Sequence, residues 1–272
     1  MRFSMFGKVT AYFVSLLTLL CNWLNIPMKP MGQRLDLNGY ELVFSDEFDG
    51  GAPDTEKWRP VAYAENGGSY AEDMVSVRDG AMVLTAAYRE NGPSGAGWYS
   101  ADLYAQPKFT HGYFEIRCIC SEGGGFWSAF WLQSDHSYEH DISKGGVGGA
   151  EIDIMEAGLY TKATASLRNA VTSAVHCNGG DDDPEKIDSK RLGRFRGNDI
   201  YRTYNTYGLE WTQEEYIFYV NGVETVRTDF AKGVSQVPEY LRISLCLPEK
   251  VTLKEGETVR MLVDYVKVYQ KP

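Results

Sequence analysis

The chain has 272 residues, of which 43% are hydrophobic and 13% aromatic, enough for one large domain with a substantial core. Its formal net charge of −10 argues against a polyanionic partner, because nucleic-acid binding needs a basic stripe and the sequence has none. Abundant aromatic residues and 28 glycines favour many short strands joined by turns over a helical bundle. An acidic protein is compatible with a neutral substrate such as a polysaccharide.

The N-terminal segment has the layout of a secretory signal peptide or an uncleaved membrane anchor. Arg2 and Lys8 precede an apolar run that starts at Val9 and is broken only by small polar residues. No second apolar stretch approaches membrane-spanning length. We therefore expect residues 1–26 to direct export, so that the protein is secreted or at the cell surface. Contact with a membrane would come only through this segment, if it is retained. A buried N-terminal helix is the alternative.

From Pro30 onward, hydrophobic residues alternate with polar ones, as in half-buried strands. Asp79-Gly80 and Asn221-Gly222 predict tight hairpin turns between such runs. No alternating strand–helix rhythm is present, so we expect an all-β fold, a single antiparallel two-sheet sandwich over residues 36–272. The predicted strands lie within Tyr40–Phe48, Met74–Tyr88, Gly112–Cys120, Ala170–Cys177, Tyr204–Thr212, Glu215–Thr228, Tyr240–Leu247 and Val259–Gln270.

Four polar, glycine-rich segments are predicted to be loops that rim a binding face. They are Asn91–Gly97, Ser121–Gly125, Asp135–Gly149 and Asn178–Gly197. The five cysteines show no disulfide-scaffold or metal-binding spacing, so we expect them to be buried thiols.

The segment Gly149–Gly158, "GAEIDIMEAG", places three carboxylates within six residues of an apolar strand. In a strand, Glu151 and Asp153 point to one face, but a regular strand would turn Glu156 to the opposite face. If Met155 is the extra residue of a β-bulge, Glu156 returns to the face of the other two acids. The sequence therefore predicts a bulge that gathers three acids on one side.

The spacing of these acids fits a retaining glycosidase. Four effective strand steps separate the two glutamate backbones by roughly 13 Å. Side chains that lean inward then leave roughly 5–6 Å between the carboxyl groups, near the ~5–5.5 Å of retaining enzymes. Asp153, between them, can separate their protonation behaviour. A solvated strand face and a metal site are the alternatives. Activity that survives a strong chelator would exclude the metal.

The motif "EIDIME" resembles the catalytic signature of glycoside hydrolase family 16, in the bulged form of laminarinase-type members. The resemblance extends over roughly Leu42 to Gln270 in seven ordered blocks. These include "LVFSDEFDGGAPDTEKW", "FTHGYFEIRCICSEGGGFWSAFWLQ", "YNTYGLEWTQEEYIFYVNG" and "MLVDYVKVYQ". It implies a concanavalin A-like β-jelly roll with a concave cleft and endo-acting, retaining hydrolysis of β-linked glycans.

The resemblance also implies residue roles. Glu151 would be the nucleophile, Glu156 the acid/base and Asp153 their assisting partner. Trp127, Trp131 and His176 would lie in or under the cleft, although core packing is an alternative for each. Ser100 and Arg117 are weaker matches and further expected substrate contacts, although each can instead support the sheet. Weaker matches, any of which can instead support the sheet, are Glu115, Trp211 and Tyr216.

Many family members hold a structural calcium between the first and last strands. Glu47 and Asp264 stand at comparable positions, so the resemblance suggests calcium there and no cofactor for catalysis. Two departures affect the cleft. Met74 stands where many relatives have a substrate-contacting Asn, and the segment Asp135–Gly149 is longer and more polar than usual.

The expected function is hydrolysis of a polysaccharide by an endo-β-1,3- or β-1,3-1,4-glucanase that acts as a monomer. A galactan- or host-glycan-cleaving specificity is the alternative within the same chemistry. A glycan-binding jelly roll without catalysis is the alternative of another class. Loss of at least one catalytic carboxylate would be expected of such a binder, but this sequence retains all three.

Overall fold

The computed structural model describes residues 20–21, 24, 26–65, 67–134, 146–158, 169–177, 188–230 and 233–272. The predicted export segment, residues 1–26, lies almost entirely outside these residues. In the described part of the chain, no helix has both the length and the apolar character to cross a membrane. Strands dominate. The short 3-10 helix η1 spans Glu72–Met74, and residues 146–148 form another 3-10 turn.

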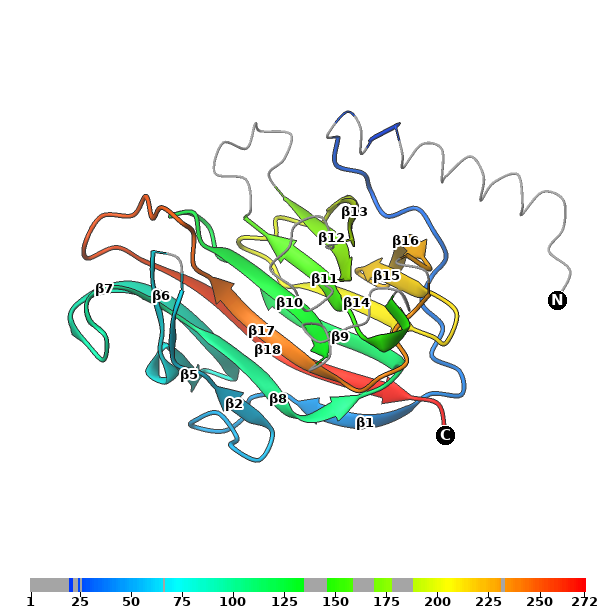
Figure 1. The fold of residues 1–272 in the computed structure, drawn as a ribbon, viewed down its shortest axis with the longest axis horizontal. Coiled ribbons are helices and arrows are strands. Elements are labelled where there is room, and N and C mark those ends of the chain that lie inside the picture. Colours follow the sequence, from blue (N-terminus) through cyan, green and yellow to red (C-terminus); the bar gives the residue numbers. More distant parts are fainter. Residues whose placement is uncertain are drawn as a thin grey trace, which may run out of the picture.

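Two sheets form the molecule (Figure 1). In spatial order, the seven-stranded sheet consists of β13 (Asp188–Arg196), β12 (Ala170–Cys177), β11 (Glu151–Ala157), β10 (Trp127–Ser134), β17 (Glu239–Cys246), β8 (Asp102–Phe109) and β2 (Trp58–Pro60). The eleven-stranded sheet follows the order β16 (Val223–Thr228), β15 (Tyr216–Val220), β14 (Asn205–Trp211), β9 (Gly112–Ile119), β18 (Thr258–Gln270), β6 (Ala81–Gly92), β7 (Gly95–Ser100), β4 (Gly68–Tyr70) and β3 (Tyr63–Glu65). In the same sheet, β1 (Glu41–Asp46) pairs with β18, and β5 (Val75–Arg78) pairs with β6.

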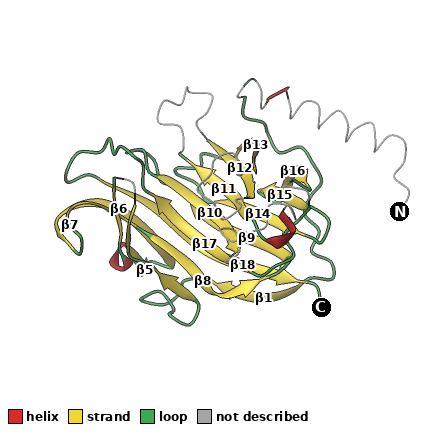
Figure 2. Ribbon diagram, in the orientation of Figure 1, coloured by secondary structure: helices red, strands yellow, loops and turns green. Residues whose placement is uncertain are grey.

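The sheets lie face to face, and one hydrophobic core joins them (Figure 2). Phe114 and Ile116 on β9 belong to the same buried cluster as Phe130 and Leu132 on β10. All strand pairs are antiparallel except β4 with β7. The predicted all-β, two-sheet sandwich is confirmed. Successive side chains of a strand point to opposite faces, so every second residue of the seven-stranded sheet faces away from the core.

The alternating runs correspond to strands, and both hairpin turns form where predicted. Asp79 and Gly80 adopt φ of 54° and 71°, and Asn221 and Gly222 adopt 51° and 69°. Positive φ at two successive residues matches the right-handed twist of the flanking strands. Met74 is buried in the core, so it makes no contact with the cleft described below.

Two predicted loops are partly wrong. Within Asn178–Gly197, residues 188–196 form strand β13, and within Asn91–Gly97 the strands β6 and β7 reach Gly92 and start again at Gly95. β13 is the edge strand of its sheet, and its exposed polar residues Ser189, Lys190 and Arg191 conceal the hydrophobic alternation.

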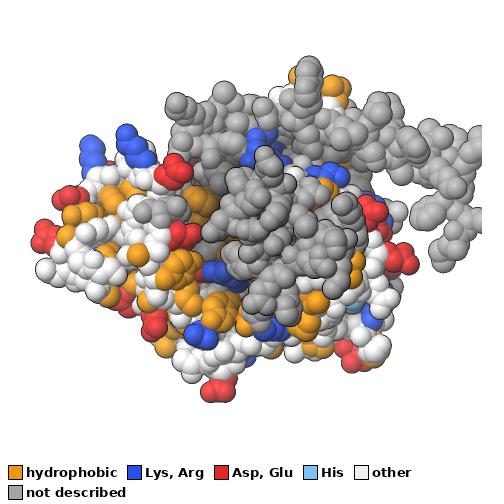
Figure 3. Space-filling model, in the orientation of Figure 1, with side chains coloured by type: hydrophobic (Ala, Val, Ile, Leu, Met, Phe, Trp, Pro, Cys, Tyr) orange, Lys and Arg blue, Asp and Glu red, His pale blue; other side chains and the backbone are white. Residues whose placement is uncertain are grey.

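The visible face of the molecule has an uneven charge distribution (Figure 3). Acidic side chains are scattered over its left, lower and right parts, and Lys and Arg side chains lie at its upper left and, next to hydrophobic ones, in its lower middle.

Candidate active site

A β-bulge interrupts β11 at the predicted place. Towards β10, Asp153 pairs with Trp131 and Met155 pairs with Phe130, which leaves Ile154 without a partner in that register. The register with β12 shifts over the same residues. The bulge is therefore present, but Ile154, not Met155, is the extra residue relative to β10.

The backbone at the bulge is anchored from the neighbouring strand. The Ser173 hydroxyl on β12 donates a hydrogen bond to the carbonyl oxygen of Ile154, at 2.9 Å. This bond provides a partner for a polar group that the interrupted ladder would otherwise leave buried and unpaired. The side chains of Ile154 and Met155 are both buried, so the extra residue adds to the core while it restores the direction of Glu156.

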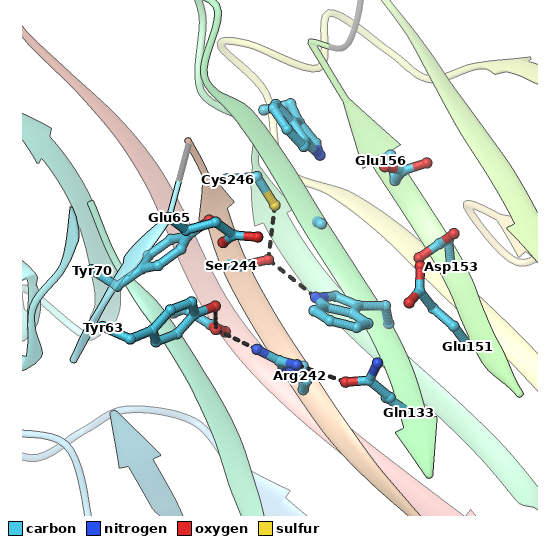
Figure 4. Close-up of a pocket in the computed structure, with 14 residues that line it drawn as sticks. Tyr63, Glu65, Tyr70, Gln133, Glu151, Asp153, Glu156, Arg242, Ser244 and Cys246 are labelled. Atoms are coloured by element: carbon cyan, nitrogen blue, oxygen red, sulfur yellow. Dashed lines mark hydrogen bonds and ion pairs between the residues drawn. The ribbon is translucent and has the colours of Figure 1, made fainter. Parts of the chain in front are cut away.

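Glu151, Asp153 and Glu156 line one cleft of about 490 Å³ over the seven-stranded sheet (Figure 4). Trp127 and Trp131 contribute to the floor from β10, as expected. The other lining residues are Tyr63, Glu65, Tyr70, Asp102, Ala129, Gln133, Arg242, Ser244 and Cys246. The three acids therefore face a common space large enough for a ligand.

His176 is bound to the middle acid. Its Nε2 lies 3.1 Å from Oδ2 of Asp153, and its Nδ1 lies 2.8 Å from the hydroxyl of Ser189. Burial alone would lower the pKa of His176, but the hydrogen bond and negative charge of Asp153 outweigh burial and raise it to about 9. A protonated His176 therefore brings one positive charge to the cluster of three acids.

Burial raises the pKa of both glutamates above that of an exposed carboxylate. Desolvation, followed by the charge of Asp153, raises the pKa of Glu151 to about 7. The same two causes raise the pKa of Glu156 to about 8, and the charge of Glu151 adds to them. The nearby Arg242 acts in the opposite direction on Glu151. When Glu151 is ionised, its charge raises the pKa of Glu156, so the pair favours one ionised and one protonated glutamate.

Trp131 is held in place at its edge and on one face. Its indole N–H donates a 3.0 Å hydrogen bond to the Ser244 hydroxyl, and the Arg242 guanidinium lies 4.1 Å from its ring centroid. Arg242 in turn pairs with the buried Asp102 and donates a 2.7 Å hydrogen bond to Gln133. A ring fixed in this way can present its other face to the apolar face of a sugar.

Sequence reasoning missed most of the wall opposite the acids. The Tyr63 hydroxyl donates a 2.9 Å hydrogen bond to Asp102, which also accepts from Arg242. An arginine in the alternating run "YLRISLC" was the available signal, because it shares a face with Ser244 and Cys246. Cys246 lines the cleft, so the expectation of a buried thiol is wrong there.

Two expected substrate contacts lie elsewhere. Ser100 is fully buried, and its hydroxyl donates to the carbonyl oxygen of Leu245. Arg117 is on β9, in the other sheet, where it pairs with Asp264 and lies over the ring of Tyr204. Alternation shows that residues share a face, but it does not show which sheet faces the ligand. These two expectations are therefore corrected.

The weaker matches also support the fold. Trp211 and Tyr216 are buried in the core, and the Trp211 indole N–H donates to the carbonyl oxygen of Ser235. Glu115 accepts hydrogen bonds from the hydroxyls of Tyr113 and Tyr265, on the outer side of β9.

The residues expected to bind calcium do not fit a shared ion. Glu47 forms a 2.8 Å ion pair with Lys267, and Asp264 is paired with Arg117. Each carboxylate therefore already has a positive partner, and those partners would repel a divalent cation.

Glu151, Asp153 and His176 satisfy a geometric requirement for a metal site, because one ligand atom of each lies within 4.8 Å of the others. The Asp153–His176 hydrogen bond gives the same arrangement a second explanation, since it satisfies both groups without an ion. The metal alternative thus rests on the same residues as the proposed catalytic group.

Comparison with known proteins identifies the family. A family model described as the GH16 domain of β-porphyranases A–D matches residues 41–271. The chain belongs to glycoside hydrolase family 16. It is therefore a glycosidase that hydrolyses O-glycosyl bonds, and the predicted family resemblance is confirmed.

Two relatives of this family 16 hydrolase illustrate its similarity to characterised proteins. It is 27% identical over 260 residues to a β-glucanase of Rhodothermus marinus, and the match covers 85% of each chain. It is also 27% identical over 264 residues to a keratan-sulfate endo-1,4-β-galactosidase of Sphingobacterium multivorum. That match covers 86% of this chain and 56% of the relative, so the chain spans little more than half of that protein.

A solved structure has the same fold. The crystal structure of SCLam, a non-specific endo-β-1,3(4)-glucanase from family GH16, superimposes with a TM-score of 0.72. The match covers 92% of this chain and 98% of SCLam at 22% sequence identity. At this identity the similarity establishes the jelly-roll architecture alone.

Proposed function

We propose that this family 16 hydrolase cuts β-linked polysaccharide within the chain, with retention of configuration, and that Glu151 and Glu156 perform the reaction. The observation behind the proposal is the bulge in β11, through which both glutamates and Asp153 line the same cleft. A retaining mechanism needs a nucleophile and a proton donor close enough to act on one glycosidic bond.

In the first step, a Glu151 carboxylate oxygen bonds to the anomeric carbon. The bond between that carbon and the glycosidic oxygen breaks, and Glu156 gives its proton to the departing oxygen. Burial raises the pKa of Glu156 to about 8, so this carboxyl can hold a proton for the departing oxygen at neutral pH. Asp153 lies between the two glutamates in the strand, its charge raises the pKa of both, and His176 holds its carboxylate in place.

In the second step, Glu156 acts as the base. It takes a proton from water, the water oxygen bonds to the anomeric carbon, and Glu151 leaves as a carboxylate. The anomeric carbon is inverted twice, so the product keeps the β-configuration. Transfer to a sugar hydroxyl would use the same residues, with the sugar in place of water.

A β-1,3- or β-1,3-1,4-glucan is the proposed substrate. The Rhodothermus marinus relative, which matches 85% of this chain, is named as a β-glucanase. The indole of Trp131, fixed by Ser244 and Arg242, supplies a flat surface suited to the apolar face of a β-linked glucose unit.

A β-galactan is the second candidate, and a specific observation favours it. The family model that matches residues 41–271 is described by β-porphyranases, and the Sphingobacterium multivorum relative is named as an endo-1,4-β-galactosidase. Both candidates use the same three acids, so the difference between them lies in the contacts that the cleft makes with the sugar rings.

A digestion panel tests the proposal. Laminarin, mixed-linkage glucan, agarose-type galactan, keratan-type glycan and mucin O-glycans are incubated with the enzyme and, as a control, with Glu151→Gln. We expect oligosaccharides from the glucans and none from the Glu151→Gln variant. Oligosaccharides from a galactan alone would establish the second candidate. Binding of a glycan without turnover by the unaltered enzyme would instead support the non-catalytic alternative.

We also propose that the protein is exported and acts as a monomer. The basic residues and apolar run at the N-terminus support export. Expression in a bacterial host with separation of membrane, periplasmic and external fractions tests this, and sequencing of the N-terminus tells cleavage from retention. Accumulation in the cytoplasm with Met1 retained would contradict it. The molecular mass of the purified enzyme, measured by sedimentation, tests whether it is a monomer.

A further inference from the structure

A row of cations and aromatic rings leads out of the cleft across the seven-stranded sheet. Starting at Asp153 on β11, successive cross-strand partners are Trp131 on β10, Arg242 on β17, Tyr104 on β8 and Arg59 on β2. Directly opposed residues in a sheet point to the same face. The outer end of this row therefore lies on the face that bears the three acids, but beyond the residues that line the cleft.

A second row reaches the same area. Gln133, which lines the cleft, is opposite Tyr240, and Tyr240 is opposite Lys108. The rings of Tyr104 and Tyr240 touch, with centroids 5.2 Å apart and planes inclined by 49°. We name the four outer residues of the two rows, Arg59, Tyr104, Lys108 and Tyr240, the outer platform.

The outer platform combines exposed cations with half-buried rings. The Arg59 guanidinium lies 5.4 Å from the centroid of Tyr104, and the Lys108 ammonium lies 4.3 Å from that of Tyr240. Both cationic side chains are exposed, whereas both rings are intermediate in exposure. The two rings therefore form the base of the outer platform, and both cationic side chains are exposed beside them.

The charge of Arg59 is not neutralised by a neighbour. Among the residues that the structure describes, Arg59 forms no ion pair, whereas Arg242 in the same row pairs with Asp102. An exposed, unpaired guanidinium is a strong donor for the oxygens of an anionic group, because its planar fork offers two parallel N–H bonds. Such a site is a local exception in a chain with a net charge of −10.

The position of the outer platform suits a long glycan. β8 is three strands away from β11, which is roughly 14 Å at the usual strand spacing. A polysaccharide that runs across the strands from Glu151 would reach Tyr104 and Arg59 with a sugar unit remote from the reacting bond. Tyrosine rings pack against sugar carbons, and their hydroxyls hydrogen-bond with sugar hydroxyls.

We propose that the outer platform binds a sugar unit that bears an anionic group, a sulfate ester or a carboxylate, on the polysaccharide that the enzyme cuts. This proposal rests on the proposed function, because its ligand is the same polysaccharide. The outer platform would give the enzyme a preference for acidic glycans over their neutral forms, and this preference would not depend on the catalytic acids.

Binding measured without turnover tests the proposal. The Glu151→Gln full-length chain is titrated calorimetrically with laminarin and agarose oligosaccharides of at least eight sugars, each in neutral, sulfated and C6-oxidised form. We expect at least one anionic form to bind about tenfold more tightly than its neutral form at low salt, and this advantage to decrease as salt is added. Comparison of the sulfated with the C6-oxidised oligosaccharides shows whether the preferred anionic group is a sulfate ester or a carboxylate.

Variants locate the effect. Arg59→Gln combined with Lys108→Gln should remove the roughly tenfold preference and leave binding of neutral oligosaccharides unchanged. Arg260→Gln is the matched control, because it removes an exposed positive charge from β18 in the other sheet. Equal binding of neutral and anionic forms, or an equal loss in Arg260→Gln, would overturn the proposal. Absence of cleavage by the unaltered enzyme would refute the proposed function separately, since this assay reads binding alone.

Discussion

Glu151 is directly opposite His176 across the β11–β12 pair, whereas Glu156 is opposite Thr172 on the same strand. The nucleophile candidate therefore has the cationic imidazole as its cross-strand partner, and the proton-donor candidate has a neutral hydroxyl side chain. The positive charge of His176 lowers the pKa of both glutamates, whereas an ionised Glu151 raises the pKa of Glu156.

The asymmetry predicts a bell-shaped dependence of kcat/KM on pH. Activity should fall below the Glu151 pKa of about 7, because the nucleophile becomes protonated. It should also fall above the Glu156 pKa of about 8, because the proton donor is lost. His176→Gln should move the acidic limb to higher pH, since a cation that lowers the pKa of Glu151 is removed. A pH–rate profile of this variant that coincides with that of the unaltered enzyme would contradict the account.

Variants of the two glutamates should differ in their response to azide. Glu151→Ala and Glu156→Ala should each reduce turnover by about 100-fold or more. Azide added to Glu156→Ala should attack the covalent intermediate and give a β-glycosyl azide. In Glu151→Ala it should take the place of the nucleophile and give an α-glycosyl azide. Detection of the opposite anomers by NMR would exchange the roles of the two residues.

Insertion of one further residue in the bulge should misdirect Glu156. An alanine inserted after Asp153 moves Glu156 one position along β11, which turns it towards the core face and should reduce turnover by about 1,000-fold or more. Deletion of Ile154 is the matched control, because it makes β11 regular and leaves Glu151, Asp153 and Glu156 at alternate positions, on one face. This deletion should retain far more turnover than the insertion. The circular dichroism spectrum of each variant checks its folding, and a folded insertion variant with full activity would show that the residue count does not direct the acid.

Buried Glu239 should make stability depend on pH. Desolvation raises its pKa to about 8, against the pull of hydrogen bonds from Ser235 and the Ala150 amide. The folded form therefore favours the protonated carboxyl, and its contribution to stability is complete below the unfolded pKa of about 4.5 and declines as pH rises towards about 8.

Glu239→Gln keeps a neutral group at that position at every pH. Compared with the unaltered enzyme, it should unfold at a higher temperature near pH 8 and at a similar temperature near pH 4, by thermal denaturation. The gain near pH 8 should be on the order of 1 kcal/mol or more, because each pKa unit corresponds to about 1.4 kcal/mol. An equal change at both pH values would contradict the titration of Glu239.

The sequence allowed the sandwich and the acid cluster to be predicted because both depend on local patterns. Alternation along one strand is set by backbone geometry, so the shared direction of Glu151, Asp153 and Glu156 followed from their spacing and one extra residue. The identity of that residue, Ile154 on the β10 side, depends on the register with a neighbouring strand. Strand β13 was missed because an edge strand can remain polar.

The rest of the site depends on pairing between distant parts of the chain. Arg242 meets Asp102 across 140 positions, and no local pattern predicts which strand will be next to β17. For the same reason, Arg117 was expected in the cleft but lies in the other sheet with Asp264. A period of two residues identifies two faces, but the sheet topology decides which face meets the substrate.

The metal alternative makes a different prediction from the proposed mechanism. If Glu151 and Glu156 act as described, incubation with excess EDTA should leave turnover unchanged, because His176 already satisfies Asp153. Loss of activity that is restored by added divalent cation would instead assign Glu151, Asp153 and His176 to a metal site.

The most direct test of paired action by Glu151 and Glu156 is proton NMR of the first product formed from the substrate that the digestion panel identifies. Two successive displacements at the anomeric carbon predict a β-anomer that mutarotates slowly to the mixture. An α-anomer as the first product would contradict the double displacement and the roles assigned to both glutamates.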